Sequence, residues 1–250
     1  MHRMDFKILT IYITIFIFSI AWSHSTNLKN IKKIAADDEP IGFASLNDGT
    51  TGGAGGDTII VTNIQQLVDT LKPREKNVTD PLVIFVSGTL SGYDDMIDIK
   101  RTANVSLLGL GDNAGFQGSG VKIVESTNII VRNLTFADCT VEEKDGLTIT
   151  EESNNIWIDH CTFTDSPASD PDGDDHDGLL DIKHGSYNIT ISYNYFNNHR
   201  KTALFGHSES ETGDVNMKAT YYCNWFDGTY SRHPRARYGK VHLLNNLYAG

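Results

Sequence analysis

Residues 188–196 read Asn-Ile-Thr-Ile-Ser-Tyr-Asn-Tyr-Phe: a polar residue, alternating apolar and polar positions, then an Asn and an aromatic residue. Such alternation is typical of a β-strand with one buried face. Five further segments share this template and begin at Asn104, Asn128, Asn155, Lys218 and Lys240. Successive starts are 24, 27, 33, 30 and 22 residues apart. One strand per repeat at this period predicts a solenoid, in which each repeat forms one coil.

The kind of solenoid follows from what the repeats lack. A leucine-rich horseshoe needs Leu-x-x-Leu-x-Leu spacing, and a propeller needs four strands in each longer repeat. The repeats of this chain show neither feature. We therefore predict an all-β fold, a right-handed parallel β-helix whose coils stack about 4.8 Å apart. Alignment of the segments predicts a column of stacked Asn side chains at a bend, formed by Asn194, Asn224 and Asn246. It also predicts an aromatic column in the core, formed by Phe136, Phe163, Phe196, Phe226 and Tyr248.

The two ends of the solenoid differ in sequence. Near the N-terminal end, Thr62 is expected to cap a short helix that covers the first coil. Its apolar face would comprise Ile64, Leu67, Val68 and Leu71. Residues 81–88 are predicted to be the first buried strand. At the other end the sequence stops directly after a predicted strand, without a capping element, so we expect a C-terminally incomplete domain.

The N-terminal region has the pattern of a secretory signal peptide. A basic start precedes an almost unbroken apolar run at 8–22, and small residues stand at −3 and −1 of a cut after Ser23. This run is short for a membrane span. We expect a secreted, extracellular protein with a signal peptide at 1–23, a linker or pro-segment at 24–40, and the β-helix domain at 41–250.

Secretion bears on the cysteines and on glycosylation. With three Cys residues at most one disulfide can form, and which pair would form stays open. Four Asn-x-Ser/Thr sequons are candidates for a glycoprotein if they are exposed and the host is eukaryotic, and they begin at Asn77, Asn104, Asn133 and Asn188. The net charge of −11 argues against nucleic-acid binding. A negatively charged partner would need a local basic patch or a bridging cation.

An acidic set is the first candidate for chemistry. Glu143 stands two residues before Asp145, and Asp177 and Asp181 follow one coil later. Spacing of four residues in a strand places Asp177 and Asp181 on the same side. Carboxylates that converge from adjacent coils repel one another, and a hard cation such as Ca²⁺ relieves that repulsion. Solvated acidic loops remain an open alternative.

A basic set is the second candidate. Residues 232–237 read Arg-His-Pro-Arg-Ala-Arg, and Lys201 follows the Asn188 strand. Alternation places Arg235 and Arg237 on one face of an extended segment. Arginine clusters bind carboxylates through two parallel hydrogen bonds. A surface network of ion pairs remains open here.

Other chemistries have weaker signals. The glycine-rich residues 52–56 lack the Lys of a phosphate-binding loop, and no nucleophile elbow is present. His160 and His207 lack metal-site spacing, so we expect structural roles for them. Asp177 and Asp181 could also serve as the carboxylate pair of a glycosidase, and hydrolysis therefore stays open.

Three motifs together resemble the pectate lyase, pectin lyase and pollen allergen superfamily, and within it the pectate lyases of the first polysaccharide lyase family. They are Trp-Ile-Asp-His at 157–160, Asp-Gly-Leu-Leu-Asp at 177–181 and the 232–237 motif. The resemblance covers about residues 41–250 and implies a right-handed parallel β-helix. It also implies a calcium-dependent lyase that cleaves α-1,4-polygalacturonate in the plant cell wall by β-elimination. The expected products are 4,5-unsaturated oligogalacturonates.

The resemblance also assigns roles. Arg232 matches the catalytic base, and Lys201 and Arg237 match residues that bind the substrate, with Arg235 a further candidate. The calcium ligands would be Asp145, Asp177 and Asp181, with Glu143 as a companion. We expect a monomer with no nucleic-acid partner and no membrane association after signal cleavage. Two alternatives stay open: a pectin lyase that acts on methylated pectin without calcium, and a non-catalytic pectin-binding relative.

Overall fold

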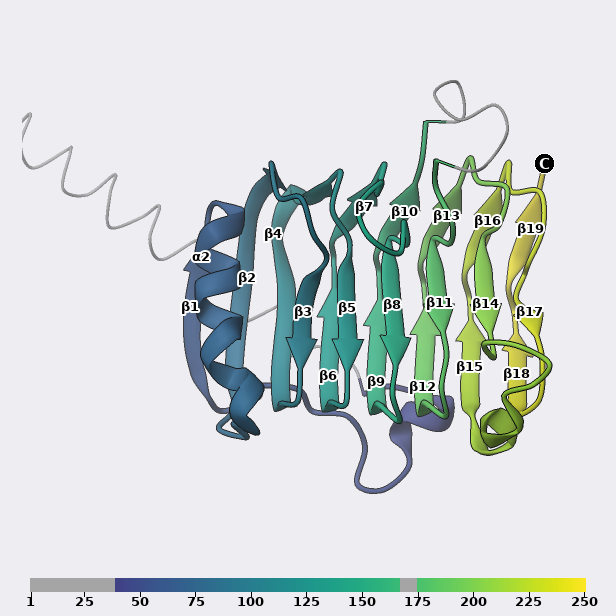
Figure 1. The fold of residues 1–250 in the computed structure, drawn as a ribbon, viewed down its shortest axis with the longest axis horizontal. Helices are drawn as coiled ribbons and strands as arrows, with labels where there is room; N and C mark the ends of the chain where they lie inside the picture. Colours follow the sequence, from purple (N-terminus) through teal and green to yellow (C-terminus); the bar gives the residue numbers. More distant parts are fainter. Residues whose placement is uncertain (1–38, 167–174) are drawn as a thin grey trace, which may run out of the picture. The chain divides into compact units, whose positions relative to one another are not determined.

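Parallel strands wind around one core in the computed structural model, which describes residues 39–166 and 175–250. They form one 13-stranded and one 6-stranded sheet. The larger sheet bends within β4 (Ala103–Gln117), because the first half of β4 pairs with β6 (Thr127–Arg132) and the second half with β7 (Thr135–Ala137). The solenoid therefore has three faces (Figure 1). The predicted parallel β-helix is confirmed.

Each successive coil adds one strand to each face. Face 1, the smaller sheet, comprises β3 (Ile97–Lys100), β5 (Val121–Val124), β8 (Leu147–Thr150), β11 (Leu180–Ile182), β14 (Ala203–Phe205) and β17 (Arg235–Ala236). Face 2 begins with β1 (Asp57–Val61) and the first part of β2 (Leu82–Ser91) and continues with the first half of β4, β6, β9 (Asn154–Asp159), β12 (Tyr187–Ser192), β15 (Lys218–Tyr222) and β18 (Lys240–Leu244). Face 3 comprises the second half of β4, β7, β10 (Thr162–Thr164), β13 (Tyr195–Asn197), β16 (Trp225–Asp227) and β19 (Leu247–Ala249).

Stacked side chains hold the coils in register. The predicted aromatic column is present: Phe136 and Phe163 stack with ring centroids 4.9 Å apart, and Phe163 and Phe196 with centroids 5.0 Å apart. The column continues through Phe226 to Tyr248 and begins one coil earlier than predicted, at Phe116. Rings that overlap at this distance attract one another in addition to burying apolar surface.

The predicted asparagine column is also present. The Nδ2 of Asn194 donates to the Oδ1 of Asn224 at 3.1 Å, and the Nδ2 of Asn224 donates to the Oδ1 of Asn246 at 3.0 Å. Both amides also donate to backbone carbonyls of face 2, at Ile158 and Ile191. The column therefore satisfies polar groups that the bend would otherwise leave buried without partners.

The expectation of one strand per repeat is wrong. Within residues 188–196, β12 ends at Ser192, Tyr193 has a φ of 53°, and β13 begins at Tyr195. Five of the six templates therefore span two strands on different faces, and the one that begins at Asn104 lies within the bent strand β4. The polar first residue also has a structural reason, since Asn188 has a φ of 54°, in the left-handed region that Asn tolerates. The apolar alternation continues through the bend, so the pattern alone did not locate it.

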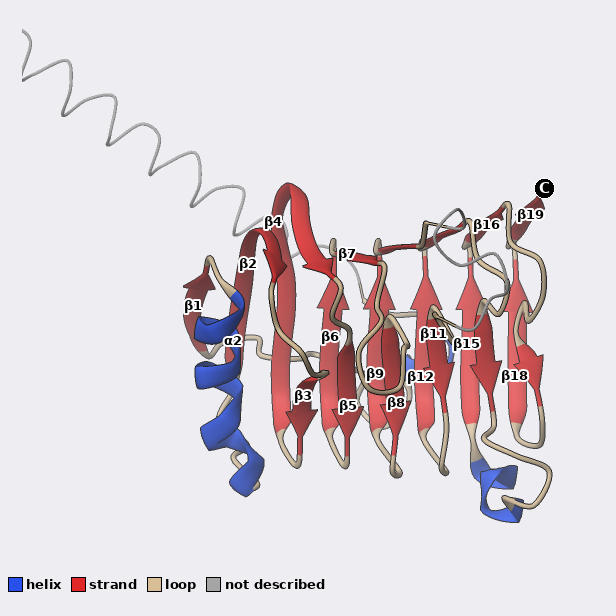
Figure 2. Cartoon of the chain, turned by 45° about the horizontal axis from the view of Figure 1, so that its top comes forward, coloured by secondary structure: helices blue, strands red, loops and turns tan. Residues whose placement is uncertain are grey.

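The N-terminal end is covered by a helix, as predicted. The first buried strand is β2 (Leu82–Ser91), at the predicted position, and β1 (Asp57–Val61), which is exposed except at Val61, pairs with its outer edge. Helix α2 (Ile64–Leu71) lies against the same end of the stack (Figure 2) and continues into the 3-10 helix η2 (Lys72–Lys76).

The helix cap differs from the predicted one. The side chain of Asn63, rather than Thr62, accepts from the backbone N–H of Gln66 at 3.0 Å. The backbone N–H of Thr62 donates instead to the Oε1 of Gln66 at 2.9 Å. Three apolar residues of the helix are buried as expected, at Ile64, Leu67 and Leu71, whereas Val68 is only half-buried.

A segment before β1 runs along the outside of face 2 across several coils. This strap, residues 41–53, includes the 3-10 helix η1 (Gly42–Ser45). Its backbone is held by one polar side chain from each strand that it crosses. The contacts are Phe43 N to Thr220 Oγ1, Ala44 N to Thr190 Oγ1, Leu46 O to Asn155 Nδ2, Gly52 N to Asn128 Oδ1 and Gly53 N to Ser106 Oγ.

The remaining predictions concern the N-terminal segments, the cysteines and the glycosylation sequons. The signal peptide at 1–23 and most of the 24–40 segment lie outside the described residues. All three cysteines are unpaired, with Cys139 and Cys161 buried. Of the sequons, Asn77 is exposed, whereas Asn188 is buried and bonds to Asn155. Within 39–166 and 175–250, no helix is long and apolar enough to cross a membrane.

Candidate active site

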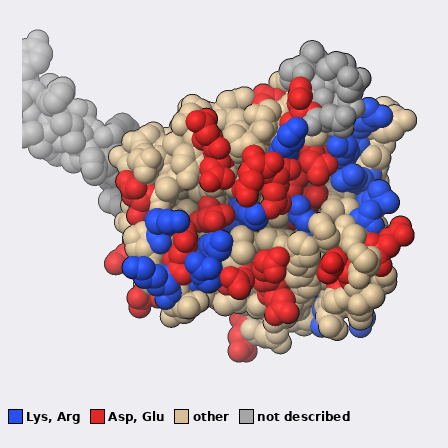
Figure 3. Space-filling view, in the orientation of Figure 1, with Lys and Arg blue, Asp and Glu red and all other residues tan. Residues whose placement is uncertain are grey.

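The outer surface of face 1 carries a row of charged and polar side chains. Strand register aligns Asp98, Lys122, Thr148, Asp181 and Arg235 in this order, and the apolar Leu204 takes the position between Asp181 and Arg235. Acidic side chains gather over the middle coils, and basic ones gather over the C-terminal coils and, in a second group, toward the N-terminal end (Figure 3). The boundary between the two regions brings the acidic and basic sets of the sequence together.

Three carboxylates meet on adjacent coils. One oxygen from each of Asp145, Asp177 and Asp181 lies within 4.8 Å of the other two. Asp181 is in β11, between the core residues Leu180 and Ile182. Asp145 and Asp177 lie in the turns that precede β8 and β11, so Asp177 is not in the strand that its spacing suggested. This group is called the carboxylate cluster below.

The turn at the cluster requires a glycine. A Cβ on Gly178 would lie 2.3 Å from Oδ1 of Asp181 and 3.1 Å from Oδ1 of Asp145. The backbone N–H of Gly178 instead donates to Oδ1 of Asp145 at 2.8 Å. The close approach of this backbone therefore allows the two carboxylates to lie together.

The cluster is an unfavourable place for carboxylate charge without a cation. Burial raises the pKa of Asp145, and burial together with the Asp145 charge raises the pKa of Asp181 well above its ordinary value. Oδ2 of Asp181 is buried and has no hydrogen-bond partner among the described residues. Carboxylate oxygens that converge in this way are the ligands that Ca²⁺ prefers, so the residues present fit a calcium ion.

A lysine that the sequence analysis did not single out enters the cluster. Nζ of Lys183 lies 3.0 Å from Oδ2 of Asp145, 2.9 Å from Oε2 of Glu143 and 3.9 Å from Oδ2 of Asp181. Burial opposes its charge, but the neighbouring carboxylates outweigh burial and raise the pKa of Lys183 above its ordinary value. Its position two residues after Asp181, on the same side of the strand, was the available signal.

The basic set lies beside the cluster, in a groove of about 460 Å³. Nζ of Lys201 is 3.3 Å from Oδ1 of Asp177, and a bridge between Lys201 and Ser231 joins the two coils. Arg232 and Arg235 also line the groove. The structure therefore brings the predicted acidic residues and three of the four predicted basic residues to one surface.

Arg232 and Arg237 differ in their surroundings. Arg232 has a φ of 63°, and its guanidinium makes no hydrogen bond or ion pair with any described residue. Nη1 of Arg237 donates to the carbonyls of Gly206 and His207, both at 3.1 Å. Arg237 therefore fixes the turn after β14, and its predicted role in substrate binding stays a prediction.

Comparison with known proteins identifies the family. A family model described as pectate lyase matches residues 7–250. The chain belongs to the pectate lyase family. It is 40% identical to a pectate trisaccharide-lyase of Bacillus licheniformis over 216 aligned residues, and the alignment covers 85% of this chain and 62% of that protein. It is 37% identical over 219 residues to a probable pectate lyase B of Aspergillus terreus, over 87% of this chain and 64% of that protein. The chain thus spans less than two thirds of these curated relatives.

Solved pectate lyases have the same fold. The crystal structure of a pectate lyase from Bacillus sp. N165 in complex with trigalacturonate superposes with a TM-score of 0.77 and 34% identity, over 83% of this chain and 67% of that one. A second pectate lyase structure, described for substrate specificity and the anti β-elimination mechanism, superposes with a TM-score of 0.74 and 29% identity, over 83% and 71% of the two chains.

The signature at 157–160 lies on face 2 of this pectate lyase family member, on the sheet that lacks the carboxylate cluster. The guanidinium of Arg132 covers the Trp157 ring at 4.2 Å, and its Nε lies 2.8 Å from Oδ2 of Asp159. Nδ1 of His160 lies 2.6 Å from the same oxygen. Ser192 Oγ donates to Oδ1 of Asp159. These contacts join adjacent coils and give the signature a structural role.

A second group of possible metal ligands lies near the carboxylate cluster, and the sequence analysis did not identify it. Ligand atoms of Asp138, Asp165 and His176 lie within 4.8 Å of one another. Asp165 Oδ2 is 2.5 Å from Nδ1 of His199, whose Nε2 is 2.7 Å from the carbonyl oxygen of Asp177. His199 thereby links this set to the backbone of the carboxylate cluster. The residues are far apart in sequence, so no spacing indicated them.

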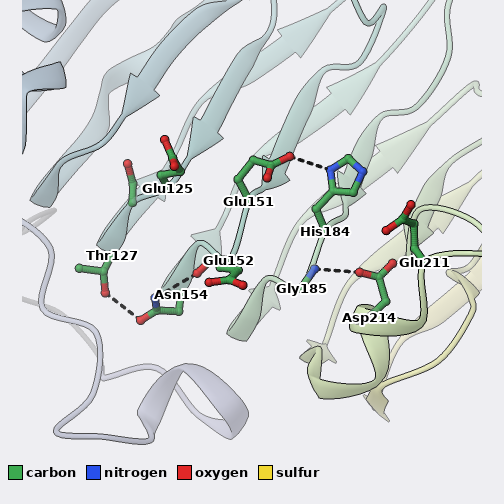
Figure 4. Close-up of a pocket in the computed structure, with 11 residues that line it drawn as sticks. Glu125, Thr127, Glu151, Glu152, Asn154, His184, Gly185, Glu211 and Asp214 are labelled. Atoms are coloured by element: carbon green, nitrogen blue, oxygen red, sulfur yellow. Dashed lines mark hydrogen bonds and ion pairs between the residues drawn. The ribbon is translucent and has the colours of Figure 1, made fainter.

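A larger groove, of about 630 Å³, lies at the turns between faces 1 and 2 (Figure 4). Five of its eleven lining residues are acidic and none is Lys or Arg, and Glu151 pairs with His184 across it at 3.1 Å. Asp214 accepts from the backbone N–H of Gly185 at 2.8 Å and thereby anchors the 3-10 helix η4 (Thr212–Asn216). The groove lacks the arginines of the 460 Å³ groove, and its charge disfavours a polyanion.

Proposed function

We propose that the chain acts as a calcium-dependent pectate lyase, which cleaves α-1,4-polygalacturonate by β-elimination and releases 4,5-unsaturated oligogalacturonates. The single observation that carries the proposal is the carboxylate cluster, with three oxygens within 4.8 Å, beside a groove lined by Lys201, Arg232 and Arg235. The relative solved with trigalacturonate supports the substrate class.

The substrate bears a carboxylate on every sugar, and the chain has a net charge of −11. Binding therefore depends on local positive charge. Lys201 and Arg235 can bind sugar carboxylates directly, and guanidinium groups suit them because their N–H groups match the two carboxylate oxygens. Calcium held by Asp145, Asp177 and Asp181 would supply further positive charge to a sugar carboxylate and would make the hydrogen on C5 more acidic.

Arg232 is the group proposed to remove that hydrogen. As its C–H bond breaks, the electron pair forms the C4=C5 double bond and the bond from C4 to the glycosidic oxygen breaks. Only a neutral guanidine has a lone pair for the C5 proton, so Arg232 first releases a proton to solvent and then takes the C5 proton in its place. The leaving oxygen takes a proton from water, and the hydroxide left behind combines with the released proton, so charge and atoms balance. The guanidinium of Arg232 has no hydrogen bond within 39–166 and 175–250 to give up before it acts.

The two alternatives make different demands on the site. A pectin lyase acts on a neutral methyl ester, which needs no cation to offset charge, so the complete carboxylate cluster favours pectate. A non-catalytic pectin-binding relative would not need Arg232 in the groove. We also propose, from the sequence alone, that the protein is a secreted monomer that meets its substrate in plant cell walls.

Ultraviolet absorbance of the unsaturated product tests the proposal. The protein is incubated with polygalacturonate, first with added calcium and then with excess chelator, and methylated pectin is run in parallel. We expect absorbance that rises with calcium and stops with chelator. Cleavage without absorbance would identify a hydrolase, and absorbance from methylated pectin that ignores chelator would identify a pectin lyase. No reaction from a chain shown to be folded by circular dichroism would favour the binding-only relative.

A further inference from the structure

Lys183 occupies a position that affects any cation in the carboxylate cluster. It follows β11 directly, and its side chain is only 12% exposed. Its ammonium group contacts Glu143 and Asp145 at hydrogen-bond distance and lies 3.9 Å from Oδ2 of Asp181. One positive charge therefore lies among three carboxylates, two of which belong to the cluster.

The oxygens of the cluster are engaged unequally. Oδ2 of Asp145 accepts from both Lys183 and Thr148, and Oδ1 accepts from the backbone N–H of Gly178. Oδ2 of Asp181 has no hydrogen bond among the described residues, and the Asp177 side chain is 45% exposed. A cation that binds these oxygens would lie next to the ammonium group and compete with it for Asp145. Like charges at such short distances repel strongly where water is excluded.

We propose that Lys183 is a built-in counter-ion of the carboxylate cluster, which lowers the affinity of the cluster for calcium and stabilises the folded chain when calcium is absent. The inference rests on the proposed function, because it assigns the cluster to calcium. The ammonium group neutralises buried carboxylates that would otherwise repel one another in the cation-free protein. The same charge weakens the binding of a divalent ion.

Lys122 provides a matched control. It lies one coil before the cluster, and its Nζ contacts Glu143 and lies 3.6 Å from Oε1 of Glu142. It shares Glu143 with Lys183, but within the described part of the chain its ion pairs are with Glu142 and Glu143 and not with Asp145 or Asp181. Removal of the Lys122 charge therefore changes the surroundings of the cluster without removing its direct counter-ion.

The test measures calcium binding by titration calorimetry without polysaccharide. For Lys183→Met we expect a calcium dissociation constant at least tenfold lower than that of the unchanged protein, which corresponds to about 1.4 kcal/mol. Lys183→Arg, which keeps the charge, and Lys122→Met should each stay within threefold of the unchanged protein. Equal or weaker calcium binding by Lys183→Met would overturn the proposal, and so would a gain of the same size in Lys122→Met.

The temperature of thermal unfolding is a second measurement, and it also shows whether each variant folds. In chelator we expect Lys183→Met to unfold at a lower temperature than the unchanged protein, and saturating calcium should close that gap. A loss that is equal with and without calcium would contradict the counter-ion role. If Lys183→Met does not fold, Lys183→Gln, which can still donate to one carboxylate, decides by the same two measurements. Absence of calcium binding by the unchanged protein would overturn this inference and the calcium site together, whereas normal binding without lyase activity would overturn only the proposed function.

Discussion

Individual residues at the site were largely predictable, because their types and spacing report their chemistry. Asp145, Asp177 and Asp181 were expected to converge on a cation, and the structure places their oxygens together. Lys183 was not expected, although it stands two residues after Asp181. That spacing relates Lys183 to Asp181 alone, whereas its closer partners, Glu143 and Asp145, lie about forty residues earlier and show no relation to it in the sequence.

The role of Arg232 is testable by an exchange that keeps its charge. We expect Arg232→Lys to retain binding to polygalacturonate but to lose at least about a hundredfold in turnover, since a positioned base contributes on the order of 10²–10⁴. Affinity is measured by titration calorimetry and turnover by product absorbance. Arg235→Lys, in the same groove, should keep most of the turnover. Unchanged turnover in Arg232→Lys would remove Arg232 from the proposed role.

His233 predicts a pH effect on stability. Burial lowers the pKa of His233 below its ordinary value of 6.5, so the unfolded chain binds the proton more tightly. Its contribution to stability is complete above pH 6.5 and is lost as pH falls through the lower pKa of the folded state. Its ring lies edge-on to Phe226, and its Nε2 bonds to Oγ1 of Thr229.

The measurement compares urea unfolding of the unchanged protein and His233→Gln at several pH values, with calcium held constant. The free energy of unfolding of the unchanged protein should fall more steeply below pH 6.5 than that of the variant. Other histidines titrate in both proteins, so only the difference between the two curves reports on His233. Parallel curves would show that His233 does not titrate differently on folding.

At the scale of elements, the repeating strands were predictable and their divisions were not. The alternation that identified residues 188–196 continues through the bend at Tyr193, so two strands gave the pattern of one. The Asn and Phe columns were recognised because stacking repeats the same residue at the same position in each coil. The strap at 41–53 has no such repetition, and only its contacts with face 2 show where it lies.

The strap should add to stability through Asn155. Its Nδ2 donates to the carbonyls of Leu46 and Gly49 at 2.8 and 3.2 Å, and its φ of 51° is one that glycine accepts. We expect Asn155→Gly to lower the free energy of unfolding by about 1–3 kcal/mol, because two part-buried hydrogen bonds to backbone carbonyls, each contributing about 0.5–1.5 kcal/mol, are lost. Hydrogen exchange of the backbone N–H groups of the strap should also become faster.

Asn188→Gly is the matched control for that variant. Asn188 occupies the same position one coil later, with a φ of 54°, and its side chain bonds to Asn155 rather than to the strap. Both variants carry the cost of a glycine, but only Asn155→Gly should speed exchange within residues 41–53. Equal exchange in the two variants would mean that Asn155 does not hold the strap.

For the whole molecule, the parallel stacking of coils explains how distant segments form one site. Asp145 and Asp181 come from successive coils and Arg232 from two coils later, and the register of β8, β11, β14 and β17 brings them to face 1. The fold class and the two charged sets followed from repeat and spacing. The link from Asp165 through His199 to Asp177 did not, because it depends on side-chain positions that no repeat specifies.

The central claim is that the carboxylate cluster is the cation site on which lyase activity depends. The most direct measurement is the calcium concentration that gives the half-maximal rate of unsaturated product formation, in the unchanged protein and in Asp181→Asn. Asparagine can still accept the bond from the backbone N–H of Leu204, so the fold should persist. Asp98→Asn, in β3 at the N-terminal end of the same face, is the control. We expect Asp181→Asn to need at least about tenfold more calcium, in keeping with the loss of a charged ligand, and Asp98→Asn to match the unchanged protein. An Asp181→Asn protein with an unchanged rate and calcium requirement would contradict the account.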